Sequence, residues 1–366
     1  MIRVHVNNLI PGMLLADDVY ADRNWVIPVL LKGSVISEEL IKKLKAHGIN
    51  NIYVRDMSVL TFGVVPEQRP SVISPELKEE ALDSIRSLFD SVSKKDIHAS
   101  AQVIKHVEHV AEQLVSSIGS DHGALVNIND LRSYDEYTYH HSLSVAVLAI
   151  AIGQRLGLQE DELRNLGKCA LMHDIGKVDI PIEIINKPSR LNEEEYALMK
   201  CHPAVGYDYL NNQKFGDRKL LAGLLYHHEK VDGTGYPSGL RGETIPLWSR
   251  IISVGDVYDA LTSNRPYRSP LQPAEAIEYV MAGIGSAFDF NVVKAFSQKV
   301  ELYPPGSIVE LSNGELAVVI KSQNNLRPLV RLIDKKINVD LRSDYRYLNI
   351  VIKRAVSVED IQSRAV

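Results

Sequence analysis

The pattern of apolar and polar positions divides the chain into three regions with different periods. The first region, residues 1–62, mixes strand-like and helical stretches. Strands are predicted where apolar residues alternate or run together, at 2–6, 25–31 and 52–54. Between the last two, Ser37 is a predicted N-cap for a helix over 38–47 that Gly48 ends. We therefore expect a small α+β domain at this end of the chain.

A linker is predicted over residues 63–75, because its prolines interrupt any helix. From Glu76 the period becomes helical, with one apolar face made of Leu77, Ala81, Leu82, Ile85, Leu88, Phe89 and Val92. Connecting helices should fill 76–134, and a helix-rich block should continue to about 300, with helices at 97–118, 139–156, 160–173, 193–210 and 217–228. Strand-like alternation returns only at 307–333, where Asn313-Gly314 predicts a hairpin in a short β-rich appendage, 305–366. The expected fold class is mainly α.

Composition narrows the range of partners and locations. A chain of 366 residues suits two or three domains. Its net charge of −5 predicts no broad positively charged surface that would bind DNA. An anionic ligand would therefore need cationic side chains at its own binding site. The longest plain apolar run, 145–152, is too short to span a bilayer, and the N-terminus lacks the apolar core of a signal peptide. Cys169 and Cys201, both in apolar helical contexts, are expected to be buried thiols. We expect a soluble cytoplasmic protein without membrane insertion.

Candidate metal ligands gather in the helical block. The adjacent pair His173-Asp174 offers a nitrogen and a carboxylate, whose two oxygens suit a bridge between two metal ions. An isolated His-Asp pair more often satisfies itself at a helix end. Here, however, each candidate lies at or near the end of an apolar segment, and together they make most of a two-metal shell: His141, His173, Asp174, His202, His227, His228 and Asp256. Other histidines, such as His98, His106, His109 and His140, are expected to be surface or core residues.

The stretches around these ligands closely resemble one bacterial enzyme family. They are His173-Asp-Ile-Gly-Lys, His202-Pro-Ala-Val-Gly, His227-His-Glu-Lys-Val-Asp-Gly-Thr-Gly-Tyr-Pro and Asp256-Val-Tyr-Asp-Ala-Leu-Thr-Ser-Asn-Arg-Pro-Tyr-Arg. They resemble the HD-GYP domain of cyclic dinucleotide phosphodiesterases, with the similarity running over 135–304. The N-terminal unit resembles a small domain of unknown function often found ahead of HD-GYP. The resemblance implies a helical HD-type metallohydrolase bundle.

The resemblance also implies roles for individual residues. One metal would be held by His141, His173, Asp174 and Asp256, and Asp174 would bridge to a second held by His202, His227 and His228. A water or hydroxide bridging the metals, usually iron or manganese, is the family's nucleophile. Lys177 would contact the scissile phosphate and Arg265 and Arg268 would bind phosphate, which explains how an acidic chain holds a dianion. Tyr236 would contact a base or a partner, and Glu229 and Asp232 would orient His228 and the turn Gly233–Gly235.

One departure from the family bears on metal number. Some members bind a third metal through a glutamate four residues before the first histidine, a place that Tyr137 occupies here. Glu136 lies about 140° round an ideal helix from His141. We therefore expect two divalent metals.

The function implied is hydrolysis of cyclic di-GMP to linear pGpG, with onward cleavage to GMP. Three alternatives stay open: cyclic GMP-AMP as substrate, a receptor that binds a cyclic dinucleotide without turnover, and a generic nucleotide phosphohydrolase of the wider HD superfamily. A diguanylate cyclase (GGDEF) is a candidate protein partner. The apolar face of the helix at 76–92 predicts packing either within the chain or in a homodimer.

Overall fold

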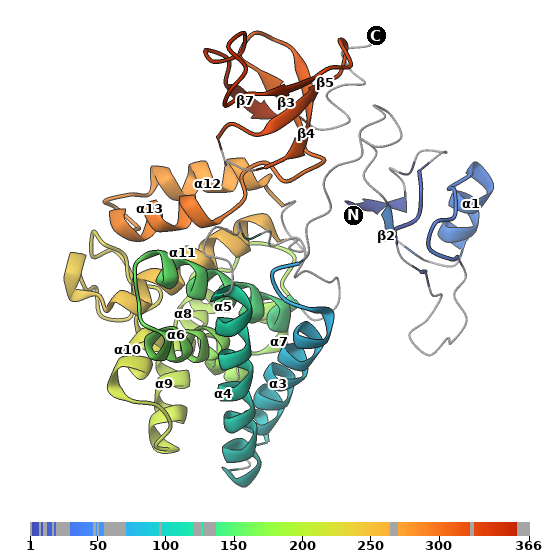
Figure 1. Ribbon diagram of the computed structural model, residues 1–366. Coiled ribbons are helices and arrows are strands. Elements are labelled where there is room, and N and C mark those ends of the chain that lie inside the picture. The colour runs from blue at the N-terminus through green and yellow to red at the C-terminus, as the bar shows by residue number, and fades with distance from the viewer. Residues whose placement is uncertain are drawn as a thin grey trace. The chain divides into compact units, whose positions relative to one another are not determined.

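The computed structural model describes all residues except 1, 7–8, 10–12, 17, 20–29, 47–48, 50, 55–70, 95–96, 120–125, 127–136, 264–269, 323–325 and 357–366. The chain divides into two compact units (Figure 1), one of residues 70–302 and the other of residues 1–69 and 303–366. The finer boundaries expected within the chain stay predictions. The described residues are mainly helical, as expected, with an antiparallel sheet near the C-terminus.

Helices make up the unit of residues 70–302. In chain order they are α3 (Pro75–Ser93), α4 (Ile97–Gly119), α5 (Tyr137–Arg155), α6 (Glu160–Met172), η3 (Ile175–Asp179), α7 (Ile182–Ile185), α8 (Glu193–Met199), α9 (His202–Asn212), α10 (Arg218–Leu225), η4 (Gly242–Thr244), α11 (Leu247–Thr262), α12 (Pro273–Ala282) and α13 (Phe290–Lys299).

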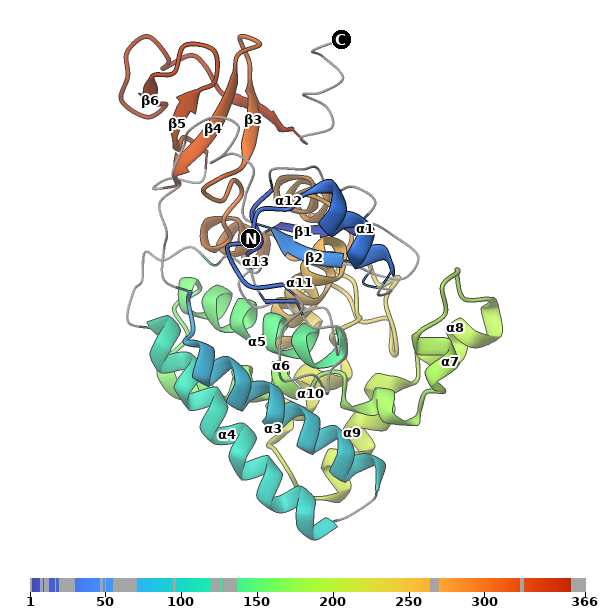
Figure 2. The same cartoon turned by 90° about the vertical axis from the view of Figure 1, so that its right-hand side faces the viewer.

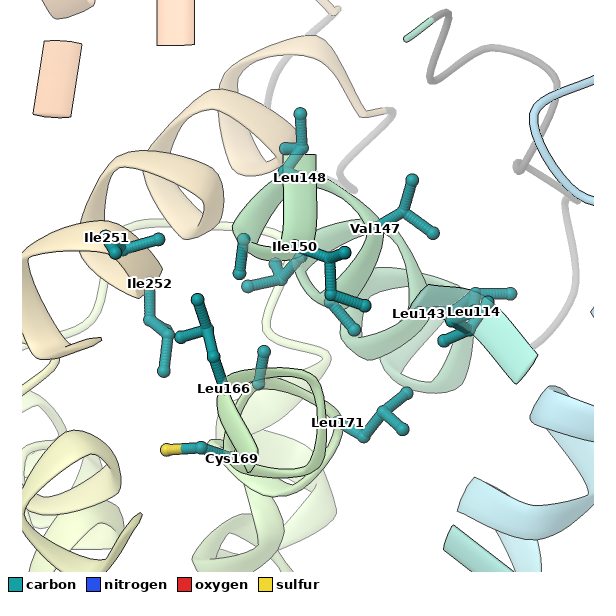
Figure 3. Packing of buried hydrophobic residues seen from close by; sticks show 14 of the residues in the cluster. Leu114, Leu143, Val147, Leu148, Ile150, Leu166, Cys169, Leu171, Ile251 and Ile252 are labelled. Carbon is teal, nitrogen blue, oxygen red and sulfur yellow. The ribbon is translucent and has the colours of Figure 1, made fainter. Parts of the chain in front are cut away.

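Helix α5 lies at the centre of this unit. Its residues 143–152 are all buried, which fits a helix that is apolar on nearly every side. Leu148 and Ile150 meet side chains of α6 and α11, including Leu166 and Ile252 (Figure 3). Because α5, α6 and α11 carry candidate ligands at or beside this core, packing fixes the positions of those ligands.

The amphipathic helix α3 is covered by its own chain. All seven residues of its predicted apolar face are buried, and the helix packs against α4 and α5 (Figure 2). The apolar face that suggested a homodimer is therefore covered within the chain and is not available to a second subunit. The predicted linker also ends one residue early, since Pro75 is the first residue of α3, where a missing N–H costs nothing, and Ser74 caps the helix.

One predicted helix is wrong. The stretch 193–210 forms two helices, α8 and α9, separated by Lys200 and Cys201. Pro203 at the second position of α9 has no N–H to continue the hydrogen bonds of α8, so the chain restarts there. This break places His202 at the beginning of a helix. The helix predicted at 217–228 likewise ends earlier, at Leu225.

The remaining unit contains two small structures. Near the N-terminus β1 (Ile2–His5) pairs antiparallel with β2 (Asn51–Val54), and α1 (Glu38–Ala46) is capped by Ser37, as predicted. Most of the strand predicted at 25–31 lies outside the described residues. Near the C-terminus an antiparallel sheet has the order β6-β5-β4-β3-β7, with strands β3 (Ile308–Leu311), β4 (Leu316–Lys321), β5 (Leu329–Leu332), β6 (Asn338–Asp340) and β7 (Ile352–Ala355).

The predicted hairpin turn joins β3 to β4. Gly314 has a φ of +84°, a conformation that glycine adopts without steric cost. Sequence alternation thus identified this pair of strands, while β6 and β7 extend the sheet beyond the predicted stretch. Among the described helices, none has the length and apolarity that crossing a bilayer requires.

Candidate metal centre

The seven predicted ligands converge within the helical unit. His141 lies in the second turn of α5, His173 ends α6, Asp174 precedes η3, and His202 begins α9. The pair His227-His228 follows α10. Six of the seven side chains are buried and His228 is partly buried. Each candidate ligand was expected at or near the end of an apolar segment. This was wrong for Asp256, which lies in the middle of α11.

Hydrogen bonds to the outer ring nitrogens fix how three of the histidines point. The Nδ1–H groups of His173, His202 and His227 donate to backbone carbonyls three residues earlier, at 2.7, 2.8 and 2.5 Å. A carbonyl oxygen can only accept, so Nδ1 carries the proton and a neutral ring presents a bare Nε2 lone pair. Such outer hydrogen bonds are typical of metal-binding histidines.

The inward atoms form two groups that meet at Asp174. One group is His141, His173 and Asp174 and the other is His202, His227 and His228, and in each the ligand atoms lie within 4.8 Å of one another. Asp174 Oδ2 lies 3.5 Å from His173 Nε2, and its Oδ1 lies 3.3 Å from His202 Nε2. Each oxygen of this carboxylate therefore faces a different group, as a bridging ligand requires.

Asp256 also faces both groups. Its Oδ1 lies 3.2 Å from His141 Nε2 and its Oδ2 lies 3.7 Å from His228 Nδ1. The sequence resemblance had assigned Asp256 to one metal alone. In the structure its two oxygens border both groups.

Several of these inward atoms are acceptors that face one another. His202 Nε2 and His227 Nε2 lie 3.3 Å apart, although both rings already donate through Nδ1. The buried Nε2 of His173 has no hydrogen-bond partner within the described part of the chain. Opposed lone pairs repel unless a cation lies between them. The residues therefore fit a dinuclear metal site.

The electrostatics of three of the histidines favour metal binding over protonation. Burial lowers the pKa of His173, lowers that of His227 well below its usual value, and lowers that of His228 to about 3. Burial would also lower the pKa of His141, but its hydrogen bonds with Asp256 and Asp259 raise it to about 9. Three of the rings are therefore neutral at pH 7 and ready to donate to a metal.

The two carboxylates are ionised despite their burial. Burial alone would raise the pKa of Asp174, but Lys177, followed by His173 and His202, holds it well below its usual range. Burial would also raise the pKa of Asp256, but its hydrogen bond with His141 and the electrostatic effect of His228 hold it well below its usual range. Lys177 Nζ lies 2.5 Å from Asp174 Oδ2, so this predicted substrate-binding cation borders the centre.

Tyr236 lies beside the second group. Its ring stacks on His228 with the centroids 4.8 Å apart. Burial raises the pKa of Tyr236, and the electrostatic effects of Tyr196, Asp256 and Asp174 raise it further. Its hydroxyl is therefore neutral at physiological pH. The predicted phosphate-binding residues Arg265 and Arg268 lie outside the described residues.

Glu229 organises the loop that carries Tyr236, and its predicted effect on the orientation of His228 stays a prediction. Its buried carboxylate accepts hydrogen bonds from the backbone N–H groups of Ser238 (2.7 Å) and Leu240 (3.1 Å). Asp232 behaves as expected in the turn, where its Oδ1 accepts from both the amide and the hydroxyl of Thr234. The two acidic residues thus hold the loop from its inner and outer sides.

Asp259 is a functional residue that the sequence did not identify. Its Oδ2 accepts from the Ser263 hydroxyl, at 3.2 Å, and also lies 2.8 Å from His141 Nδ1. It therefore orients a ligand 118 residues away. The available signal was its spacing of three residues from Asp256, which places both carboxylates on one face of α11.

The two cysteines differ. Cys169 is buried as predicted, and burial raises the pKa of its thiol. The prediction was wrong for Cys201, which is exposed. Cys201 lies in the break between α8 and α9, outside both helices.

Comparisons with known proteins identify the family. A family model described as an HD domain matches residues 125–292. A cyclic di-GMP phosphodiesterase of Pseudomonas aeruginosa is 33% identical over 316 residues, covering 81% of this chain and 76% of the relative. The chain belongs to the HD-GYP family of HD-domain proteins. It is homologous to cyclic dinucleotide phosphodiesterases.

Two further similarities place this HD-GYP protein among its relatives. A 3'3'-cGAMP-specific phosphodiesterase of Vibrio cholerae is 35% identical over 240 residues, covering 62% of this chain and 55% of the relative. An HDG"Y"P protein from Bdellovibrio bacteriovorus has a solved structure with a TM-score of 0.52 and 19% identity, covering 81% of this chain and 97% of that one. This last similarity supports the fold alone.

Proposed function

We propose that this HD-GYP protein hydrolyses cyclic di-GMP to pGpG, with onward cleavage to GMP. The observation that carries the proposal is the position of Asp174, whose two oxygens each face one of two histidine groups. The similarity to a cyclic di-GMP phosphodiesterase over most of both chains supports the choice of substrate.

This arrangement supports the ligand roles that the family resemblance implies. His141, His173, Asp174 and Asp256 would hold one ion, and His202, His227 and His228 would share Asp174 around the other. A mixed set of imidazoles and carboxylates suits iron or manganese. Two such ions would supply an activated water and neutralise charge on the phosphate oxygens.

The protein's own residues hold and orient the phosphate. Lys177 pairs with Asp174. When substrate binds, its ammonium group would instead donate a hydrogen bond to a phosphate oxygen. Arg265 and Arg268, which lie outside the described residues, would add positive charge. Tyr236, kept neutral by burial, would offer an aromatic face and a hydroxyl donor to the ligand.

The test is anaerobic turnover of cyclic di-GMP by iron- or manganese-loaded protein, compared with Asp174→Ala. We expect at least about a hundredfold loss in the variant, with helical content retained and fewer ions per chain. Asp208→Ala, an exposed position on α9, is the matched control and should keep full activity. Full activity in Asp174→Ala would refute the proposed site.

Two alternatives remain as outcomes of the same assay. Turnover of cyclic GMP-AMP but not of cyclic di-GMP would identify cyclic GMP-AMP as the substrate, as the name of the Vibrio relative indicates for that protein. Tight binding of a cyclic dinucleotide to metal-loaded protein without turnover would make the chain a receptor. A cytoplasmic location and a diguanylate cyclase partner stay predictions.

A further inference from the structure

The segment that joins the two ligand motifs projects from the helical unit. Between Lys177 and His202 the chain forms α7 and α8, which contain no buried residue. Figure 2 shows both helices at the periphery of the unit, beyond α9. Tyr196 on α8 is 50% exposed, an unusual place for a large aromatic ring in a helix without a core face.

This exposed segment is nevertheless held in place. At the start of α8, Asn192 and Glu195 form a capping box, and Lys187 Nζ binds the Glu195 carboxylate at 2.5 Å. At its end, the carbonyl of Met199 accepts the hydrogen bond from His202 Nδ1. The position of α8 is therefore tied directly to a ligand of the metal centre.

Aromatic and cationic groups extend outward from the centre along this connection. Tyr236 stacks on His228, and Tyr196 lies three residues before Met199, whose carbonyl holds the ring of His202. Lys200, two residues before His202, places its ammonium 5.0 Å from the centroid of the Tyr196 ring. A cation over one face of the ring leaves the other face for a different partner.

We propose that Tyr196 binds substrate by stacking on a purine base of the cyclic dinucleotide, with Lys200 meeting the phosphate that the metal centre does not hold. The inference rests on the proposed function. A cyclic dinucleotide has two bases and two phosphodiesters, and the metal centre engages only one phosphodiester during cleavage. Aromatic faces bind bases well because every base has a π-face, and a lysine binds phosphate as a point charge. Tyr196 and Lys200 supply both, six and two residues before the candidate ligand His202.

The test separates base recognition from metal chemistry with two substrates. Cyclic di-GMP carries purines, whereas bis(p-nitrophenyl) phosphate is a phosphodiester without them. For Tyr196→Ala we expect the KM for cyclic di-GMP to rise about tenfold, the size of one lost base stack, with kcat within about twofold. Hydrolysis of bis(p-nitrophenyl) phosphate and the number of bound ions should not change. Tyr196→Phe should retain a KM close to that of the unmodified protein, since it keeps the ring.

Leu198→Ala is the matched control. Leu198 is also exposed on α8, but it lies about 200° round the helix from Tyr196, so its loss should leave the KM unchanged. An unaltered KM in Tyr196→Ala, with the unmodified protein active, would overturn the stacking role and leave the proposed function standing. If cyclic di-GMP binds without turnover, calorimetry gives the same comparison through Kd. Absence of both binding and turnover would refute the function and this inference together.

Discussion

The backbone of Gly176 lies directly against that of His202. A β-carbon at Gly176 would lie 2.0 Å from the carbonyl oxygen of His202 and 2.6 Å from the amide nitrogen of Gly206. The contact is reciprocal, because a β-carbon at Gly206 would lie 3.2 Å from the amide nitrogen of Gly176. Only glycines allow η3 and α9 to approach this closely, and that approach brings Asp174 within 3.3 Å of His202.

Replacing Gly176 with alanine should separate the two halves of the centre. The methyl group would meet backbone atoms that no rotamer change can move, so we expect a loss of about 1–3 kcal/mol in the free energy of unfolding. Urea denaturation and a count of bound ions would measure both effects, with fewer than two ions per chain expected. Gly119→Ala is the control, since its nearest neighbour would lie at 3.9 Å. Equal stability of the two variants would contradict the close contact.

Asp259→Asn should weaken metal binding at His141 without removing a ligand. The amide can present either an oxygen or an NH2 group to His141 Nδ1, but it no longer carries the charge that favours a protonated Nδ1. We expect metal affinity to fall by about 10- to 100-fold, as for other residues that orient a ligand. Titration of the metal-free protein with Mn²⁺ would measure this. An affinity equal to that of the unmodified protein would mean that Asp259 supports only the fold.

Glu229→Gln should loosen the loop that carries Tyr236. The side chain would bring an NH2 group toward one of two backbone donors, Ser238 or Leu240, and would lose the charge that strengthens both hydrogen bonds. We expect a loss of about 1–3 kcal/mol in stability together with a raised KM, while the number of bound ions stays the same. Glu243→Gln, an exposed position in η4, should change neither quantity. Loss of metal in Glu229→Gln would instead mean that the residue acts through His228.

The two cysteines should react with iodoacetamide at very different rates. Cys201 is exposed, whereas Cys169 is buried with a raised pKa, so at pH 8 it has little reactive thiolate and no access for reagent. Mass spectrometry of the folded protein should find one alkylated thiol, at Cys201, and two after denaturation. Modification of Cys169 in the folded state would show that α6 opens readily.

Much of the fold and the set of candidate ligands could be predicted from local sequence. The spacing of apolar residues gave the buried face of α3 from Leu77 to Val92, because a regular helix turns each residue through a fixed angle. Asn313-Gly314 predicted the turn between β3 and β4, since glycine alone adopts its φ freely. His173, Asp174, His202, His227 and His228 stood in motifs specific enough to be named as ligands before any geometry was known.

Only the tertiary structure decided how those residues meet. Asp259 reaches His141 across 118 residues, and periodicity records which face of a helix is buried but not what lies against it. The same limit applies to the break before His202, to the exposure of Cys201 and to the two-sided position of Asp256, each of which depends on packing between distant segments. The sequence by itself determined which side chains could bind metal, and folding determined which atoms of those side chains face one another.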